Sequence, residues 1–296
     1  MNIDYLKAFY VTVKANSISK AARIMHLTQP GLSMQIQSLE KELQVSLLNR
    51  SNRGVELTEA GQIVFDYANT ILSLQDNIER DLTNLKTHKK KLLIGSCKSI
   101  GEYALPCSVY IYKHENPDID INLEISNTAT VIDNVLNKTV NVGIVQGKID
   151  HKDLVYEKIT SNKMLLVTSL PLVKDNITIE ELKKLPLIFR EEGSGAREDI
   201  TKALSEKNIL TDDLNIIYEL NSMEAIKTSV ISAKGISFIP ELIIKRELRD
   251  KVLTNIDVED LDIVSDYYIV YKKNNNLNPY EQGFVDFLKS KKRGFC

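Results

Sequence analysis

The most constraining feature of this 296-residue chain is a pair of helical patterns joined by a very short turn within residues 17–50. Ser17 and Thr28 are N-cap residue types at the two helix starts, and Pro30 falls in a first turn, where a backbone N–H has no intrahelical partner. Apolar residues recur at helical spacing in the second pattern, at Leu32, Ile36, Leu39 and Leu43. The second helix is therefore expected to bury one face and hold the other out for a partner.

The opposite face of the second helix carries almost no charge. It presents Pro30, Ser33, Met34, Gln37 and Lys41. Hydroxyl and carboxamide groups near a helix start suit readout of base edges in a major groove. The pattern therefore favours a helix-turn-helix that binds double-stranded DNA, and the alternative is an ordinary helical hairpin in a core.

Residues 50–57 predict a small β-hairpin directly after the helix pair. Residues 52–54 supply turn residue types, and the residues after them alternate in polarity. Arg50 and Arg53 fall near the tip of the hairpin, where they suit phosphate or minor-groove contacts. The alternative is that both arginines are simply solvated.

The net charge of −2 is divided unevenly along the chain. Residues 1–57 contain seven Lys and Arg against four Asp and Glu, or +3, and the remainder contains 31 against 36, or −5. The basic balance thus lies in the predicted DNA-binding domain, residues 1–57.

Residues 58–86 predict one long helix of about 43 Å. Its apolar residues step by three or four, close to heptad spacing, at Ala60, Val64, Tyr67, Ile71, Leu74, Ile78, Leu82 and Leu85. This seam favours a linker helix that makes a dimer, with two recognition helices on successive turns of DNA. The alternative is a single helix packed on its own chain. The charged run 87–91 is interpreted as a hinge.

From residue 92 onward, short apolar runs alternate with helical patterns, which predicts an α/β domain over residues 92–296. The predicted strands cover residues 92–96, 119–126, 140–146, 154–161, 164–169, 187–189, 214–221, 236–239 and 267–271. The predicted helices cover residues 100–115, 130–138, 196–207, 223–234 and 279–289.

Four polar loops follow predicted strands and open predicted helices, at residues 96–101, 127–128, 193–197 and 221–224. Ligands of open α/β sheets bind at such strand ends, and helix N-termini with a nearby cation suit a small anion. The candidate effector-binding residues are Lys98, Ser99, Ile100, Asn127, Thr128, Gln146, Ser194, Gly195, Arg197, Met223 and Glu224. The alternative is ordinary helix capping, with the glycines needed only for turns.

Other classes of protein find little support. Cys97, Cys107 and Cys296 are too few for a disulfide framework and fit no zinc spacing, so we expect three reduced thiols. No catalytic constellation, metal site or cofactor motif occurs, so an enzyme is not expected. The absence of a signal peptide or an apolar span predicts a cytoplasmic protein.

Two alternatives to a DNA-binding regulator that senses a metabolite stay open. One is a solute-binding protein without a DNA role. The other is a redox-responsive regulator in which Lys98 lowers the pKa of Cys97, although Cys107 is a poor resolving partner for it.

Residues 2–62 resemble the winged helix-turn-helix of LysR-type transcriptional regulators. The matching positions are Ser17, Ser19, Ala21, Ala22, Thr28, Gln29, Pro30, Leu32, Ser33, Gln35, Ile36, Leu39, Glu40, Arg50, Leu57, Thr58, Ala60 and Gly61. The sequence departs from the usual family pattern at Met25, Gly31, Gln44 and Leu48. The resemblance implies that Gln29, Pro30 and Ser33 face the groove, that Thr28 and Arg50 lie near phosphates, and that Arg53 belongs to the wing.

Residues 99–106 and 189–197 resemble the branch of this family that regulates cysteine biosynthesis, sulfite reduction and carbon fixation. Lys98 departs from that branch, where a short hydroxyl residue is usual; its ammonium would favour a highly charged anion if it faced the cleft. The resemblance implies a homodimer or homotetramer with an effector domain similar to periplasmic binding proteins. Its lobe I would comprise residues 92–162 and 267–296, and lobe II residues 163–266.

Overall fold

The computed structural model describes residues 1–51, 54–87, 90–149, 151–170, 174–273 and 277–296. It divides into two compact units, Met1–Lys86 and Thr87–Cys296, and each is considered by itself. In the described part, no helix is both long enough and apolar enough to cross a membrane.

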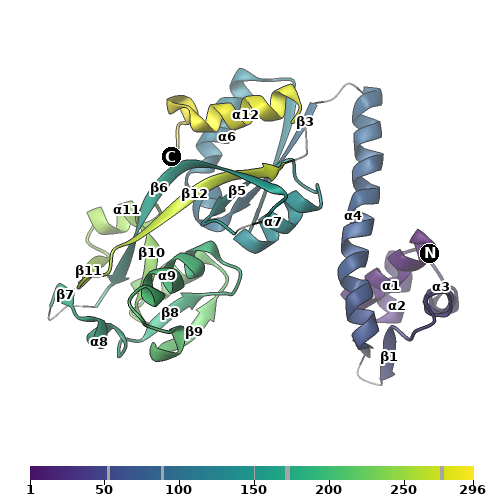
Figure 1. The fold of residues 1–296 in the computed structure, drawn as a ribbon, viewed down its shortest axis with the longest axis horizontal. Helices are drawn as coiled ribbons and strands as arrows, with labels where there is room; N and C mark the ends of the chain where they lie inside the picture. Colours follow the sequence, from purple (N-terminus) through teal and green to yellow (C-terminus); the bar gives the residue numbers. More distant parts are fainter. Residues whose placement is uncertain (52–53, 88–89, 150, 171–173, 274–276) are drawn as a thin grey trace. The chain divides into compact units, whose positions relative to one another are not determined.

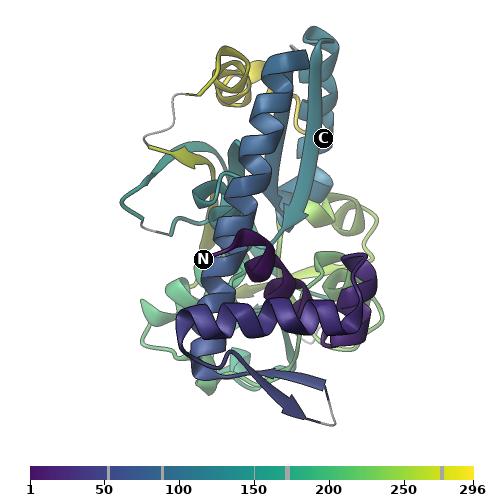
Figure 2. The ribbon, with the colours of Figure 1, turned by 90° about the vertical axis from the view of Figure 1, so that its right-hand side faces the viewer.

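The N-terminal unit is a three-helix cluster followed by a hairpin and a long helix (Figures 1 and 2). Its elements are α1 (Ile3–Ala15), α2 (Ile18–Ile24), α3 (Gln29–Leu43), β1 (Leu48–Ser51), β2 (Gly54–Leu57) and α4 (Glu59–Thr87). Buried Leu6 and Phe9 from α1 pack with Leu32 and Leu39 from α3. Helix α1 precedes the predicted pair and completes its core.

Side-chain caps fix where α2 and α3 begin. Ser17 Oγ accepts a hydrogen bond from the backbone N–H of Lys20, and Thr28 Oγ1 accepts one from Gly31 N at 3.2 Å. Helix α3 ends at Gln44, whose φ of 58° lies in the left-handed region that favours glycine. Both predicted N-caps are therefore present. Gln44, one of the residues that depart from the family pattern, occupies a strained backbone position.

The first half of α4 packs against the three-helix core, whereas its later apolar side chains point outward. Ala68 is fully buried, and Val64 and Ile71 pack against the core. In contrast, Leu74 and Ile78 are 41% and 61% exposed. The first half of α4 therefore packs within the N-terminal unit, whereas Leu74 and Ile78 lie outside the core of that unit.

The first lobe of the C-terminal unit is built on a mixed sheet. Strands β3 (Lys90–Cys97), β4 (Ile119–Ser126) and β5 (Val142–Gln146) are parallel, with β3 between the other two. Strand β12 (Ile263–Lys272) pairs antiparallel with β5. The helices of this lobe are α5 (Lys98–Tyr103), α6 (Leu105–Glu115), α7 (Thr128–Leu136) and α12 (Pro279–Lys289).

The long strand β6 (Leu154–Thr168) pairs with β12 and continues into the second lobe (Figure 1). There it pairs with β10 (Ser237–Pro240) and β11 (Thr254–Val258). The remaining elements of this lobe are β7 (Asn176–Ile177), α8 (Ile179–Leu182), β8 (Leu187–Arg190), α9 (Gly195–Ser205), β9 (Ile216–Leu220), α10 (Met223–Ile231) and α11 (Glu241–Arg249). Strands β6 and β12 thus join two lobes with separate cores.

Several predicted elements need correction. The two strands expected at 154–161 and 164–169 are one strand, because Asn162 and Lys163 lie where β6 passes between the lobes and carries polar residues. The helix expected at 100–115 is two helices, since Ala104 leaves the helical conformation just before Pro106. Helices α8 and α11 and strands β7 and β11 were not predicted.

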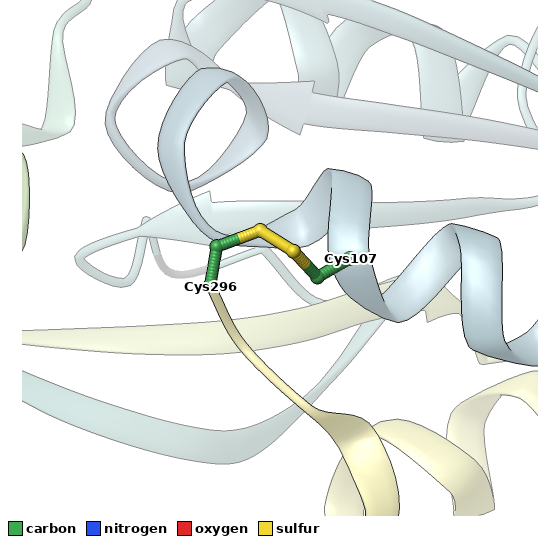
Figure 3. The surroundings of a disulfide bond; sticks show 2 residues. All are labelled: Cys107 and Cys296. Carbon is green, nitrogen blue, oxygen red and sulfur yellow. A yellow bond between two sulfur atoms is a disulfide. The ribbon is translucent and has the colours of Figure 1, made fainter.

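The expectation of three reduced thiols is wrong. Cys107 in α6 and Cys296 form a disulfide, with their Cα atoms 5.6 Å apart (Figure 3). After α12 the chain turns back along α6, and Cys296 N donates to the Ala104 carbonyl. This return, across a sequence separation of 189 residues, is what brings the two cysteines together.

Candidate functional site

The exposed face of α3 is polar and uncharged near its start. Gln29, Pro30, Met34 and Gln37 are exposed, and Met34 is 65% exposed. Ser33 is half-buried on the same helix. Gln29 Oε1 accepts a hydrogen bond from Ser19 Oγ at 3.1 Å, which links the start of α3 to α2. The surface predicted from the sequence is therefore presented to solvent, with Thr28 at its cap.

The two arginines of the predicted wing are described less fully. The backbone of Arg50 belongs to β1, which pairs with β2 as a hairpin. The side chain of Arg50 and the whole of Arg53 lie outside the described residues.

In the C-terminal unit, Ser99 and Gln146 form the centre of a buried polar network. Ser99 Oγ donates to Gln146 Oε1 at 2.6 Å, and the hydroxyl of Tyr267 donates to the same oxygen at 3.3 Å. Gln146 Nε2 in turn donates to Ser265 Oγ at 2.8 Å and to Asp199 Oδ2 at 3.5 Å. The end of β5 thereby connects α5, β12 and α9.

The two lobes meet directly beside this network. Thr128 Oγ1 donates to the Gln146 carbonyl at 3.2 Å, and Ala129 N donates to the Gly193 carbonyl at 3.1 Å. A Cβ at position 195 would collide with the same Gln146 carbonyl, so Gly195 permits this close approach. Gly193 and Gly195 therefore do more than permit a turn, because they let the loop before α9 pack closely against lobe I.

Lys98 faces the second lobe. Its Nζ donates to the backbone carbonyl of Asn221 and lies 3.5 Å from Glu191 Oε1. Four-fifths of the side chain is shielded from solvent. The alternative in which Lys98 points to solvent is therefore wrong, and its ammonium bridges the lobes.

Arg190 is a buried cation beside Lys98 and Glu191 that was not predicted from the sequence. The Arg190 side chain is 5% exposed and makes two hydrogen bonds to the Glu191 carboxylate, at 2.7 and 3.0 Å. Although burial opposes ionisation of Glu191, these bonds hold its pKa below the usual value. The available signal was its position at the end of a buried strand, directly before the glycine-containing loop 191–195.

Two further charged candidates, Arg197 and Glu224, already have hydrogen-bond and ion-pair partners. Arg197 donates to the Arg190 carbonyl at 2.7 Å and pairs with Glu219 at 2.6 Å. Glu224 accepts from the Tyr103 hydroxyl at 2.6 Å and pairs with Lys227 at 2.9 Å.

Four further candidates act mainly in local structure. Asn127 caps α7 by accepting from Thr130 N at 2.9 Å. Ile100 and Met223 are fully buried in the two lobe cores, so their side chains do not line the cleft between the lobes. Ser194 is buried at the start of α9, where its hydroxyl makes no cap hydrogen bond.

The redox alternative based on Cys97 is not supported. The thiol is buried and lies 3.5 Å from Ser99 Oγ. Burial raises its pKa, which opposes formation of the reactive thiolate, while Lys98 is engaged by Asn221 and Glu191. Among the described residues, no group of three or more His, Cys, Asp or Glu could hold a metal ion.

A capped helix pair followed by a hairpin, a long helix and a two-lobed α/β domain defines a helix-turn-helix regulator with a ligand-binding domain. Comparison with known families agrees. The model of the bacterial regulatory helix-turn-helix protein, lysR family, matches residues 3–62, and that of the LysR substrate binding domain matches residues 86–293. The chain therefore belongs to the LysR family of DNA-binding transcriptional regulators. The expectation that it is not an enzyme is confirmed by this membership.

Individual relatives are similar over nearly the whole chain. A probable RuBisCO transcriptional regulator of Phaeodactylum tricornutum is 31% identical over 97% of this chain and 95% of its own length. The crystal structure of CbnR, a LysR family transcriptional regulator, has a TM-score of 0.71 at 18% identity and covers 98% of both chains. The Synechocystis PCC6803 CcmR regulatory domain in complex with 2-PG has a TM-score of 0.61 at 24% identity, covering 68% of this chain and 96% of that one.

Proposed function

We propose that the cleft between the lobes binds a small anionic metabolite that controls the regulator. The observation that carries this proposal is the position of Lys98, which reaches from lobe I to Glu191 and the Asn221 carbonyl of lobe II. Two cations, Lys98 and Arg190, share the single Glu191 carboxylate there. An anion that displaced Glu191 from either cation would gain charge-assisted hydrogen bonds and change how the lobes are joined.

The hydroxyls beside this cation pair supply the neutral donors of the proposed site. Ser99 lies next to Lys98, Ser194 has no cap hydrogen bond to lose, and Thr128 lies at the start of α7. The CcmR regulatory domain, which is similar in fold, has been solved in complex with 2-PG. This makes 2-PG the first compound to test.

Thermal-shift and calorimetric measurements on the purified protein test the effector proposal. The ligands are 2-PG, sulfate, phosphate, sulfur metabolites and phosphosugars. An anion should raise the Tm, and Lys98→Met, Ser99→Ala and Ser194→Ala should reduce the rise, with Lys98→Met having the largest effect. Lys183→Met, which removes a lysine paired with Glu180 on α8, is the matched control. The cleft assignment fails if no anion shifts the Tm, or if Lys98→Met acts like the control.

We further propose how the N-terminal unit contacts DNA. Gln29, Pro30, Ser33, Met34 and Gln37 would meet base edges in the major groove, because they occupy the outward face at the start of α3. Thr28 and Arg50 would contact phosphates, and Arg53 would contact DNA from the wing. The regulator would act in the cytoplasm, where promoter DNA lies.

Two alanine variants separate base contacts from phosphate contacts. Ser33→Ala should weaken binding to the operator more than binding to unrelated DNA, whereas Arg53→Ala should weaken both and lower the salt dependence. The comparison uses fluorescence anisotropy at several salt concentrations. Equal effects of the two variants on both DNAs would contradict this division of roles.

We also propose that the regulator is a homodimer, or a homotetramer built from dimers, paired through α4. The exposed apolar side chains of its later turns support this proposal. An anion that rearranges the lobes would then alter the spacing of the two recognition helices on their half-sites.

A further inference from the structure

A cavity of about 460 Å³ lies beside Gln146 and is separate from the cation pair of the effector cleft. It is lined by the end of β5 and the loop after it, by one face of α9, and by β12. The lining includes Gln146, Gly147, Ile149, Asp199, Val264 and Tyr268, while Lys98, Ser99 and Arg190 do not contribute. Thr128 and Gly195, at the edge of the effector cleft, also line it. Apart from Thr128, Gln146 and Gly195, its lining residues have no part in the proposed effector site.

The charges around the cavity favour a cation. Five carboxylates line it, from Glu198, Asp199, Glu206, Asp262 and Asp266, against the two lysines Lys148 and Lys202. Asp266 is already paired with Lys158 at 2.6 Å, so four carboxylates face two ammonium groups among the lining residues. The excess negative charge therefore selects against the anions expected in the cleft.

Asp199 is the carboxylate with the least access to water. It projects from the first turns of α9, and the hydrogen bond that it accepts from Gln146 Nε2 is long, at 3.5 Å. Burial raises the pKa of Asp199 to about 6, so the carboxylate is mostly ionised at neutral pH and poorly solvated. Its hydrogen-bond partners, Ser265 and Gln146, are both neutral, so an ammonium group in the cavity would supply the charged partner that this carboxylate lacks.

The cavity also offers carbon surface beside these charges. Ile149, Ala203, Ile263, Val264 and the ring of Tyr268 line it together with the carboxylates. Asp199 on α9 and Glu206, the C-cap residue of that helix, are seven residues apart, or about 10 Å along the helix axis. Mixed apolar and acidic walls of this length suit an aliphatic chain that carries ammonium groups.

We propose that this cavity is a second ligand site, for a small aliphatic amine or diamine whose ammonium group pairs with Asp199. The aliphatic carbons pack on Ile149, Val264 and Tyr268, and a second ammonium group reaches the outer carboxylates of Glu198 or Glu206. This proposal does not depend on the identity of the anion in the effector cleft.

The two sites share one side chain, which gives the amine a route to influence the cleft. Gln146 contacts Asp199 through Nε2 and Ser99 through Oε1. An ammonium group that draws Asp199 away from Gln146 changes the partner available to Ser99. Amine and anion binding are therefore expected to alter each other's affinity by the same factor.

Isothermal titration of the full-length protein with 1,4-diaminobutane tests the site, and 1,4-butanediol is the uncharged control of matched length. The diamine should bind saturably and the diol should not. Glu198→Lys should weaken diamine binding by about tenfold or more, as expected for a reversed charge near a bound cation. Asp199→Asn should weaken it as well.

The matched control variant is Glu241→Lys. Glu241 occupies the first turn of α11, as Glu198 occupies the first turn of α9, and it does not line the cavity. Circular dichroism shows whether each variant is folded. Because Glu198 is exposed, Glu198→Lys should fold normally, so the test still holds if Asp199→Asn does not fold. The proposal is overturned if the diamine does not bind, if the diol binds equally well, or if Glu241→Lys weakens binding as much as Glu198→Lys.

Repeating the titration with 2-PG present measures the coupling between the sites. A changed diamine affinity supports the route through Gln146, and an unchanged affinity with both ligands bound excludes it. If 2-PG and the other anions do not bind, the proposed cleft fails, while the diamine isotherm still decides the second site by itself.

Discussion

Ser99 Oγ lies 2.6 Å from Gln146 Oε1, which ties the first turn of α5 to the carboxyl end of β5. Both residues are buried, and Gln146 also holds Ser265 of β12. A ligand that engages Ser99 must therefore compete with Gln146. This contact gives the cleft a defined interaction to exchange for a ligand.

The first prediction concerns the cost of losing the Gln146 carboxamide. Gln146→Leu keeps a side chain of similar size but leaves the buried hydroxyls of Ser99 and Ser265 without this partner. Unfolding in urea should show a loss of about 2–3 kcal/mol, the usual cost of unsatisfied buried polar groups. Gln282→Leu, on the exposed face of α12, should change stability little. Equal stability of the two variants would mean that the network is not needed for folding.

The second prediction concerns the Cys107–Cys296 disulfide. It closes a loop with a sequence separation of 189 residues, so breaking it should lower stability by up to about 4 kcal/mol through the entropy of the unfolded chain. Dithiothreitol should lower the Tm of the wild type and leave that of Cys107→Ser unchanged. Cys97→Ser should retain the response to dithiothreitol, because Cys97 is a free thiol. A wild-type Tm that ignores the reductant would contradict this pairing.

The third prediction concerns pH and Asp199. Burial raises the pKa of Asp199 from 3.8 to about 6, with Asp266 adding to the shift and Lys202 opposing it. A raised carboxyl pKa means that the folded state holds a proton that the unfolded state has lost, so this group's stabilising contribution falls as pH rises from about 4 to about 6.

Asp199→Asn should remove that slope and be more stable than the wild type above pH 6. Allowing for partial exposure, the gain should be on the order of 1–2 kcal/mol. Urea unfolding at several pH values measures it, and Asp262→Asn gives the baseline for losing an exposed carboxylate of the same cavity. If the difference in free energy of unfolding between the wild type and Asp199→Asn did not change with pH, the raised pKa of Asp199 would be refuted.

Local sequence signals predicted much of the fold because they act within a few residues. Ser17 and Thr28 are N-caps in the structure because cap residues act on the next turn of the chain. The strand ends at Ser126 and Gln146 agree with expectation for the same reason. The fold class and family follow from these signals together.

Features that depend on contacts distant in sequence were not predictable in this way. Hydrophobic periodicity cannot distinguish a turn at Asn162 from a strand passing between two lobes. Spacing alone does not pair Cys107 with Cys296. In the cleft, the sequence indicated Lys98 and Ser99 but not Arg190, because the position of Arg190 at a strand end does not by itself show that its side chain is buried.

The fourth prediction uses the strained end of α3. Gln44 has a φ of 58°, a conformation that costs residues other than glycine about 1 kcal/mol. Gln44→Gly should therefore stabilise the N-terminal unit by roughly 0.5–1 kcal/mol, after the larger unfolded-state entropy of glycine is counted. Lys41→Gly, within α3, should instead destabilise it by about 1 kcal/mol. Thermal unfolding followed at 222 nm compares the two, and a lower Tm for Gln44→Gly would show that strain at this position is not relieved by glycine.

The fifth prediction tests the proposed dimer. Leu74, Ile78 and Leu82 are 41%, 61% and 53% exposed along α4, at the four-residue spacing of a single helix face. Ile78→Glu places a charge in the middle of this face, so a dimer paired through it should dissociate because the carboxylate would lose its water on pairing. Sedimentation equilibrium should show a shift toward the monomer, and affinity for a two-half-site DNA should fall toward that for one half-site. Asp76→Lys changes an exposed charge about 200° around the same helix and should leave the assembly intact. If Ile78→Glu sediments as the wild type does, the subunits pair through some other surface.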